Sequence, residues 1–137
     1  ASKYLDEAIA LAPDIAQYYY VKGNVEERLG NNFNARKAFE KALELDPKLA
    51  EAYGGIGRLI FNNAVQILND ASMIKDNKLY QKEKDKADNI FRESMPYLKK
   101  AVEINPKDTD FKQALKQLYF RLQMQEEYDA ISKELDN

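Results

Sequence analysis

The sequence predicts an all-α fold in which antiparallel helix pairs stack in a row, with about seven helices in all. One observation is that helix-forming runs end at Pro13, Pro47 and Pro106, of which the first two lie 34 residues apart. Another is that small and bulky residues recur at fixed distances before the prolines: Ala1, Leu5 and Ala8, then Ala35, Phe39 and Ala42, then Ser94, Leu98 and Ala101. A period of 34 residues is typical of stacked helical hairpins.

The composition is that of a helix-rich globular chain. Of its 137 residues 45% are hydrophobic and 32% are charged, and it contains few glycines and prolines. The 21 basic and 23 acidic residues give a net charge of −2, so the chain lacks the basic excess of nucleic-acid-binding proteins and we expect no nucleic acid as partner. No apolar run approaches the roughly 18 residues of a membrane helix, so we expect no membrane contact either.

The compartment is left open by the sequence. The chain has no cysteine, and a protein without cysteine suits a reducing cytosol and an oxidising periplasm equally well. No signal peptide is visible, but the chain begins in the middle of a repeat. We therefore expect a soluble protein that is cytoplasmic or, if its parent chain carries an export signal, periplasmic.

The first three helices are predicted from apolar spacing and from the residues that end them. Residues 1–12 carry an apolar stripe at helical spacing, and Pro13 ends the run. Residues 16–29 form the next helix, and Gly30 lies where a left-handed C-terminal cap belongs. Residues 34–46 follow after a short link, which indicates that these two helices are antiparallel.

The third helix pair is predicted to be unusually long. The proline that closes it comes about 25 residues later than a 34-residue period allows. The extra residues keep helical spacing through 50–70 and 78–104, with a turn near 72–77. We therefore expect both helices to be lengthened into an arm that projects from the stack, with a kink where Pro96 removes a backbone hydrogen bond.

The last helix pair is predicted over residues 109–136. Either Asp108 or Thr109 is expected to cap its first helix. The second helix has a weaker apolar stripe, made by Tyr128, Ile131 and Leu135.

The second pair resembles a tetratricopeptide repeat. The residues that carry the resemblance are Tyr19, Gly23, Gly30, Ala35, Phe39, Ala42 and Pro47. Lys22 and Glu26 depart from the family, which has leucine and an aromatic residue at those positions, and Gln123 stands where the family prefers glycine. The resemblance implies a right-handed superhelical stack with four parts in a single domain: an unpaired second helix (1–13), one repeat (16–47), one repeat with a helical extension (50–106) and a final repeat (109–136).

The residue types argue against catalysis. Without histidine or cysteine the chain lacks the commonest general base and thiol nucleophile, so we expect no enzyme, no metal site and no cofactor. Carboxylate pairs such as Glu26-Glu27 fall on predicted polar helix faces. The glycines of 54–57 do not form a phosphate loop, because no strand precedes them and no Lys-Ser or Lys-Thr follows.

Three consecutive tyrosines, at positions 18–20, cannot all face one side of a helix, because neighbours point about 100° apart. We expect Tyr19 in the core and Tyr20 in the groove of the superhelix, where an exposed tyrosine is a frequent anchor for a partner.

The resemblance also implies which residues line the groove. The first helix of each repeat presents five positions to the concave surface. On this basis the candidate peptide-binding residues are Gln17, Tyr20, Asn24, Arg28, Glu51, Gly54, Arg58, Phe61, Asn62, Gln113, Gln117, Phe120 and Arg121. The same family positions also contain Glu27 and Asp110. For the glycines of 54–57 we expect close packing of a neighbouring helix; the alternative at Gly54 is a bare backbone that widens the groove or admits a ligand close to the helix.

The groove does not match the clamp with which some members of the family bind chaperone C-termini. Only Asn24 and Arg58 correspond to residues of that clamp. Its aromatic, amide and arginine side chains instead suit an extended peptide. We therefore predict a non-catalytic protein-interaction module that binds a peptide or partner segment in its concave groove. The alternative is self-association into a homo-oligomer or larger assembly, through the uncovered first helix or the protruding arm.

Overall fold

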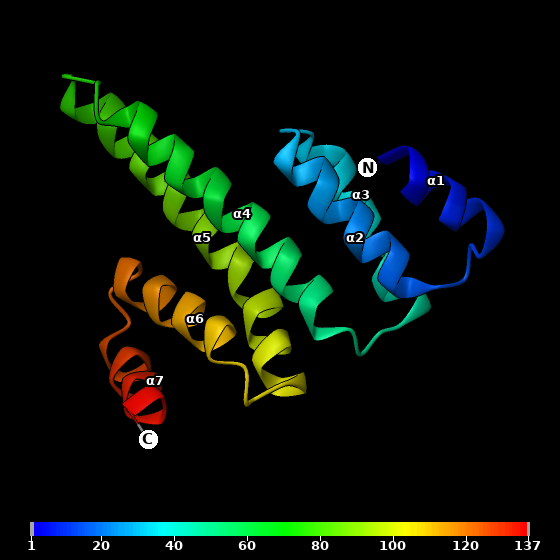
Figure 1. Ribbon diagram of the computed structural model, residues 1–137. Coiled ribbons are helices and arrows are strands. Elements are labelled where there is room, and N and C mark those ends of the chain that lie inside the picture. The colour runs from blue at the N-terminus through cyan, green and yellow to red at the C-terminus, as the bar shows by residue number, and fades with distance from the viewer. Residues whose placement is uncertain (1, 137) are drawn as a thin grey trace.

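The computed structural model describes residues 2–136, and within this range every regular element is a helix. Seven helices follow one another along the chain (Figure 1): α1 (Ser2–Leu11), α2 (Ala16–Arg28), α3 (Asn32–Leu45), α4 (Ala50–Ala71), α5 (Asn77–Ile104), α6 (Thr109–Arg121) and α7 (Gln125–Asp136). The prediction of an all-α stack of about seven helices is confirmed. Ala1, from which the first helix was predicted to start, lies outside the described residues.

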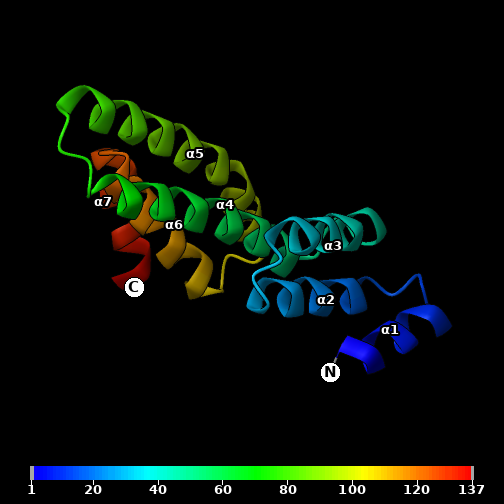
Figure 2. The same cartoon turned by 90° about the horizontal axis from the view of Figure 1, so that it is seen from above.

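The helices pack as antiparallel neighbours in three pairs, α2 with α3, α4 with α5 and α6 with α7. The pair α4 and α5 has the largest contact of all, and its closed end projects far beyond the other helices in both views (Figures 1 and 2). This is the elongated third unit that the late proline predicted. The division of the chain into one unpaired helix and three repeats stays our proposal.

Pro96 lies inside α5, which continues through it to Ile104. The axis of α5 changes direction in its last third (Figure 1), so that its C-terminal end turns toward α6. A proline inside a helix removes one backbone hydrogen bond and is a common cause of such bends.

The helix ends follow local backbone chemistry. Gly30 has φ of +81°, the left-handed conformation expected of a C-terminal cap. Asp108 caps α6, since its carboxylate accepts a hydrogen bond from the backbone N–H of Asp110 at 2.9 Å. The predicted start of the third helix at residue 34 is wrong by two residues, because the backbone N–H of Ala35 already donates to the carbonyl of Asn31 and α3 begins at Asn32.

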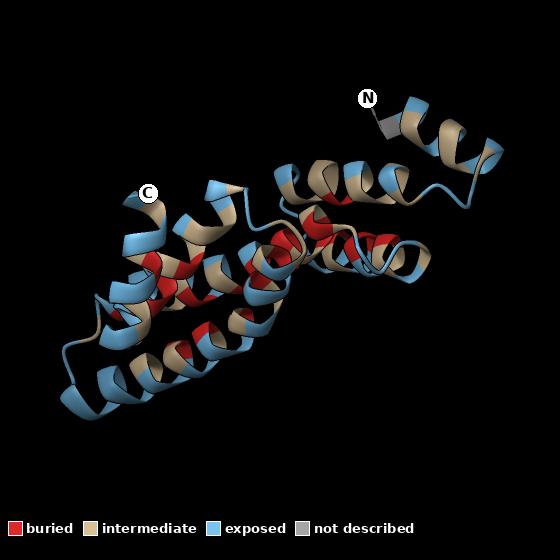
Figure 3. Ribbon diagram, turned by 90° about the horizontal axis from the view of Figure 1, so that it is seen from below, coloured by how far each residue is buried: buried red, intermediate tan, exposed pale blue. Residues whose placement is uncertain are grey.

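The core consists of two clusters that hold the stack together. One lies between α2, α3 and α4 and includes the fully buried Phe39 and Ile56. The other joins α4 and α5 to α6 and α7 around the fully buried Phe91 and Leu118. Figure 3 shows these buried positions running through the middle of the molecule. Burial of each such side chain is worth about 1.5–3 kcal/mol, so the helices that surround the site are held in fixed positions.

The N-terminal end of the stack is open, as the uncovered first helix in the sequence indicated. Among the residues that the structure describes, helix α1 packs against α2 only, and it leaves Tyr4 76% exposed and Leu11 88% exposed. Tyr19, which we placed in the core, is only half-buried. The reason is that Tyr19 shares its face of α2 with the polar Lys22 and Glu26, and the three line one shallow hollow.

Lys22 and Glu26 do not pair with each other. The Lys22 ammonium lies 3.8 Å from a carboxylate oxygen of Asp6 on α1. Glu26 accepts a hydrogen bond from the side-chain amide of Asn31 at 2.9 Å. The two polar departures from the family pattern therefore serve different contacts, Lys22 from the middle of α2 to α1 and Glu26 at the C-terminal end of α2.

Candidate functional site

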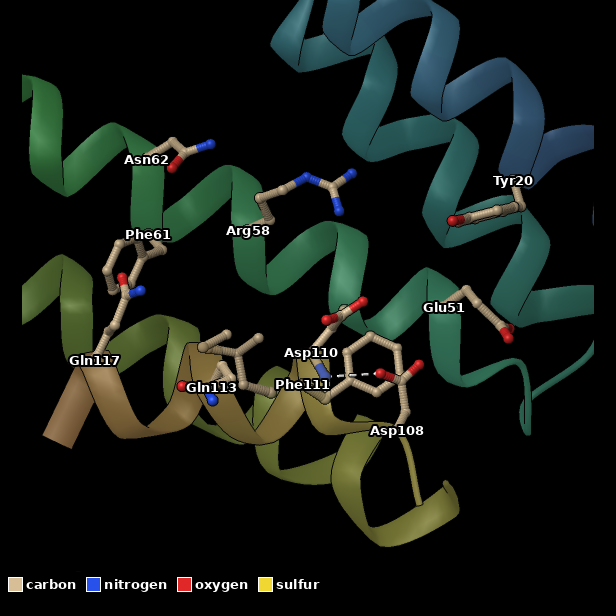
Figure 4. A pocket seen from close by; sticks show the side chains of 13 residues that line it. Tyr20, Glu51, Arg58, Phe61, Asn62, Asp108, Asp110, Phe111, Gln113 and Gln117 are labelled. Atoms are coloured by element: carbon tan, nitrogen blue, oxygen red, sulfur yellow. Dashed lines mark hydrogen bonds between the residues drawn. The ribbon is translucent and has the colours of Figure 1, made fainter. Parts of the chain in front are cut away.

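A hollow of about 480 Å³ opens between α2, α4 and α6, and we call it the groove. Figure 4 shows it from close by, with side chains from all three helices pointing into it. Its lining residues are Tyr20, Glu51, Gly54, Arg58, Phe61, Asn62, Leu98, Asp108, Asp110, Phe111, Gln113, Ala114 and Gln117.

The groove arises from two facing rows of side chains. On α4 the row begins at Glu51 and continues at steps of three or four residues through Arg58 to Phe61. On α6 the steps from Asp110 to Gln113 and Gln117 are also three and four. Residues at this spacing share one face of a helix, so each helix presents a continuous stripe to the other.

Eight of the candidate residues that the sequence supplied lie in the lining of the groove. They are Tyr20, Glu51, Gly54, Arg58, Phe61, Asn62, Gln113 and Gln117. Tyr20 also packs on the core, with its ring centroid 5.8 Å from that of Phe39. The structure thus brings these residues together, whereas their role in binding remains a proposal.

Five candidate residues lie elsewhere. Phe120 and Arg121 line a second hollow of about 450 Å³ on the outer part of α6, together with Tyr128 of α7. Gln17, Asn24 and Arg28 line neither hollow. Asn24 is instead 3.4 Å from the Arg58 guanidinium, to which its side-chain oxygen offers an acceptor.

At position 54 the structure has close packing, and the alternative of a bare backbone open to a ligand is wrong. A Cβ atom at Gly54 would collide with the ring of Phe111. The space above the backbone of α4 is therefore filled by an aromatic side chain of α6, and no room is left there for a ligand. Glycine is needed at position 54 because α6 packs so close to α4.

The sequence reasoning missed several lining residues. Phe111, Leu98 and Ala114 supply apolar surface to the groove, and Asp108 supplies a carboxylate at its rim. The sequence predicted Asp108 as a possible helix cap, but that role does not predict that it lines the same groove as Glu51. Phe111 could have been found only by knowing how α6 crosses α4.

Arg58, which lines the groove, makes a two-point contact from α4 to α2. Its Nη2 donates to Oε1 of Glu27 at 2.6 Å, and its Nε donates to Oε2 of the same carboxylate at 3.0 Å. The hydrogen bond to Glu27 raises the pKa of the Arg58 guanidinium; partial burial opposes this rise, and the negative charge of Glu27 adds to it. Arg58 is therefore permanently charged and is already satisfied by a carboxylate of α2.

The second hollow is built around cations that lie on aromatic rings. The rings of Phe120 and Tyr128 are 6.0 Å apart, and the Lys116 ammonium lies 5.5 Å from the Tyr128 centroid. The Arg121 guanidinium lies 5.6 Å from the ring of Phe61. Phe120 itself is 70% exposed, which leaves a free aromatic surface beside the groove.

Within residues 2–136 no group of three or more acidic, histidine or cysteine side chains could hold a metal ion. In the same part of the chain, no helix combines the length and the apolar character that crossing a membrane requires. The arrangement offers apolar surface, amides and charges, which are suited to binding.

Known proteins with a similar sequence or structure identify the type of fold. The family model described as tetratricopeptide repeat matches residues 16–49. A TPR repeats protein from Bacteroides fragilis NCTC 9343 is 30% identical, with a TM-score of 0.67 over 83% of this chain and 56% of that chain. No curated protein sequence matches the chain.

A second solved structure, of a monomeric mutant of IFIT1 with Gppp-AAAA, superposes on almost the whole molecule. Its TM-score is 0.79 at 19% identity, over 98% of this chain and 28% of that chain. At this identity the likeness shows the fold alone. The chain thus spans about a quarter of one of these proteins and about half of the other.

Proposed function

We propose that this chain, which is a tetratricopeptide-repeat protein, binds an extended segment of a partner protein in the groove between α2, α4 and α6. Repeats of this family generally mediate protein–protein interaction, and their fold is typically non-catalytic. The observation that carries the proposal is the pair of facing side-chain rows on α4 and α6, which leave a trough open to solvent between them.

The chemistry of the lining suits an extended chain. Phe61, Phe111 and Leu98 supply an apolar floor for a side chain of the partner. Asn62, Gln113 and Gln117 carry amides along the rim, and an amide side chain both donates and accepts hydrogen bonds. An extended peptide has unpaired backbone N–H and C=O groups that such amides can satisfy.

A binding experiment with neighbouring asparagines tests this proposal. Partners captured from a lysate by the native chain are identified, and their segments are synthesised and titrated by fluorescence anisotropy. Asn62→Ala should weaken binding about fivefold, which corresponds to one hydrogen bond of about 1 kcal/mol. Asn63→Ala is the matched control, because Asn63 is exposed on the same helix but does not line the groove. Equal affinity for both variants would refute binding in the groove.

Self-association is the second candidate, and the exposure of α1 favours it. Tyr4 and Leu11 leave a substantial apolar surface open on a helix that packs on one neighbour only. Sedimentation equilibrium distinguishes the two candidates. An assembly that dissociates in the Leu11→Glu variant supports self-association, whereas a monomer that keeps its partner supports the groove.

A further inference from the structure

We infer that the groove selects a partner segment that carries a lysine or arginine beside an apolar residue, with the cation at the end formed by the N-termini of α4 and α6. This inference rests on the proposed function and specifies the chemistry of the partner. It follows from how the charges in and around the groove are already used.

Three carboxylates surround the apolar floor at one end of the groove. Glu51 comes from the first turn of α4, and Asp108 and Asp110 come from the start of α6. Figure 4 shows Asp108 and Asp110 beside the ring of Phe111 and Glu51 farther to the right, on α4. Within residues 2–136 none of the three makes an ion pair. The Asp108 carboxylate is held in place by the backbone N–H of Asp110, so its charge is fixed beside Phe111.

The lining contains one cation, Arg58, and that cation is not free to offset these carboxylates. Its guanidinium makes two hydrogen bonds to Glu27, which is a carboxylate outside the lining. The charges of Arg58 and Glu27 cancel at this short distance. Among the side chains that line the groove, the Phe111 end therefore carries three carboxylates and no free cation, and a positively charged side chain is their complement.

The apolar floor supplies the second half of the recognition. Phe111 covers the backbone of Gly54 and presents its ring between the carboxylates, while Phe61 and Leu98 continue the floor along α4 and α5. A cation at the acidic end thus has an apolar site directly next to it. A lysine or arginine also places its aliphatic stem on such a ring while its head reaches the carboxylates.

The charge reverses toward the other end of α6. Lys116 and Arg121 lie beside the second hollow, which shares Gln113 and Gln117 with the groove. Asp110 and Lys116 are six positions apart on α6, which is about 9 Å along a helix, or about three residues of an extended peptide. The complementary segment therefore carries its cation about three residues from a carboxylate, and this fixes the direction in which it lies.

Selection from a random peptide library tests the inference without knowledge of the natural partner. Phage-displayed twelve-residue peptides are enriched on the native chain, and the winners are synthesised and titrated by fluorescence anisotropy. We expect a lysine or arginine beside an apolar residue, with an acidic residue about three positions away. The double variant Glu51→Gln and Asp110→Asn keeps the shape of the groove and should weaken these peptides about tenfold. Raised salt should weaken binding to the native chain more than to the double variant.

A matched control removes the same number and kind of charges elsewhere. Glu93→Gln with Asp136→Asn changes two exposed carboxylates outside both hollows and should leave affinity unchanged. Far-ultraviolet circular dichroism and the urea midpoint of each variant show that the fold is retained.

The outcomes separate this inference from the function on which it rests. Two results would overturn the inference and leave groove binding intact. In one, the peptides that lose affinity with Asn62→Ala carry no cation; in the other, their affinity is unchanged by Glu51→Gln with Asp110→Asn. If no enriched peptide responds to Asn62→Ala, both proposals fail. An adenine tetranucleotide RNA that binds the native chain, and binds the charge-neutralised variant more tightly, would also overturn the inference, because an anionic ligand would then occupy the groove.

Discussion

The guanidinium of Arg58 on α4 donates two hydrogen bonds to the carboxylate of Glu27 on α2, of which the shorter joins Nη2 to Oε1 at 2.6 Å. The two residues are 31 positions apart in the chain, so the contact joins one helix pair, α2 with α3, to the next, α4 with α5. It fixes α2 against α4 at the wall of the groove, and it removes a positive charge that would otherwise attract an acidic partner.

The strength of this contact can be measured by a double-mutant cycle of Arg58→Ala and Glu27→Ala. The side chains are 45% and 20% exposed, so solvent screens the pair and we expect a coupling energy of about 1 kcal/mol. The measurement is urea unfolding at low and at high salt. The coupling should fall as salt rises, and a coupling of zero at low salt would show that the contact does not hold α2 to α4.

The effect of Gly54→Ala on the free energy of unfolding should change sign when Phe111→Ala is also present. Gly54→Ala in the native chain places a methyl group against the Phe111 ring, and we expect a loss of about 1–2 kcal/mol from overpacking. With Phe111→Ala already present the same change should stabilise by up to about 1 kcal/mol, because alanine is the better helix former. Urea midpoints of the four proteins test this. Stabilisation by Gly54→Ala in the native chain would contradict the close approach of α6.

The ends of α2 and α6 offer a reciprocal test of backbone strain. Both helices end with the same pair of backbone hydrogen bonds. The N–H groups of Gly30 and Asn31 donate to carbonyls in α2, and those of Gln123 and Met124 donate to carbonyls in α6. Gln123 has φ of +57°, a left-handed conformation that costs a non-glycine residue about 1 kcal/mol. Gln123→Gly should therefore stabilise the protein, and Gly30→Gln should destabilise it by a similar amount. Thermal unfolding measures both, and changes of equal sign would contradict this account.

Tyr119 predicts a loss of stability at alkaline pH. Burial raises the pKa of its phenol, and the nearby Glu127 and Glu134 raise it further. Below about pH 10 the phenol is neutral in both the folded and the unfolded state, and its full contribution to the free energy of unfolding is present. As pH rises further the unfolded chain ionises first, so the free energy of unfolding falls until the pKa of the folded state is passed.

Tyr119→Phe should therefore make the decline in unfolding free energy above pH 10 less steep. Urea unfolding at a series of pH values measures the slope. Tyr4→Phe is the control for loss of a hydroxyl group, since Tyr4 is 76% exposed whereas Tyr119 is 7% exposed. An unchanged slope in Tyr119→Phe would show that this phenol is not responsible.

Much of the groove was within reach of sequence reasoning because helical repeats place equivalent positions on equivalent faces. Tyr20, Arg58 and Gln117 lie in the lining where the repeat positions put them. Gln17 and Arg28 line neither hollow, since the way α2 packs on α4 decides which of its residues reach the groove, and their role in binding stays a prediction.

The helices, their pairing and the long arm can be predicted from the chain alone, because they depend on residues close together in it: a proline that ends a run, Gly30 with its left-handed backbone, and apolar residues at helical spacing. The contact of Phe111 with Gly54 and the hydrogen bonds of Arg58 to Glu27 become visible only once the helices are packed. These contacts join residues far apart in the chain. They depend on the angles and distances at which whole helices pack, and those are set by the shapes of many side chains together.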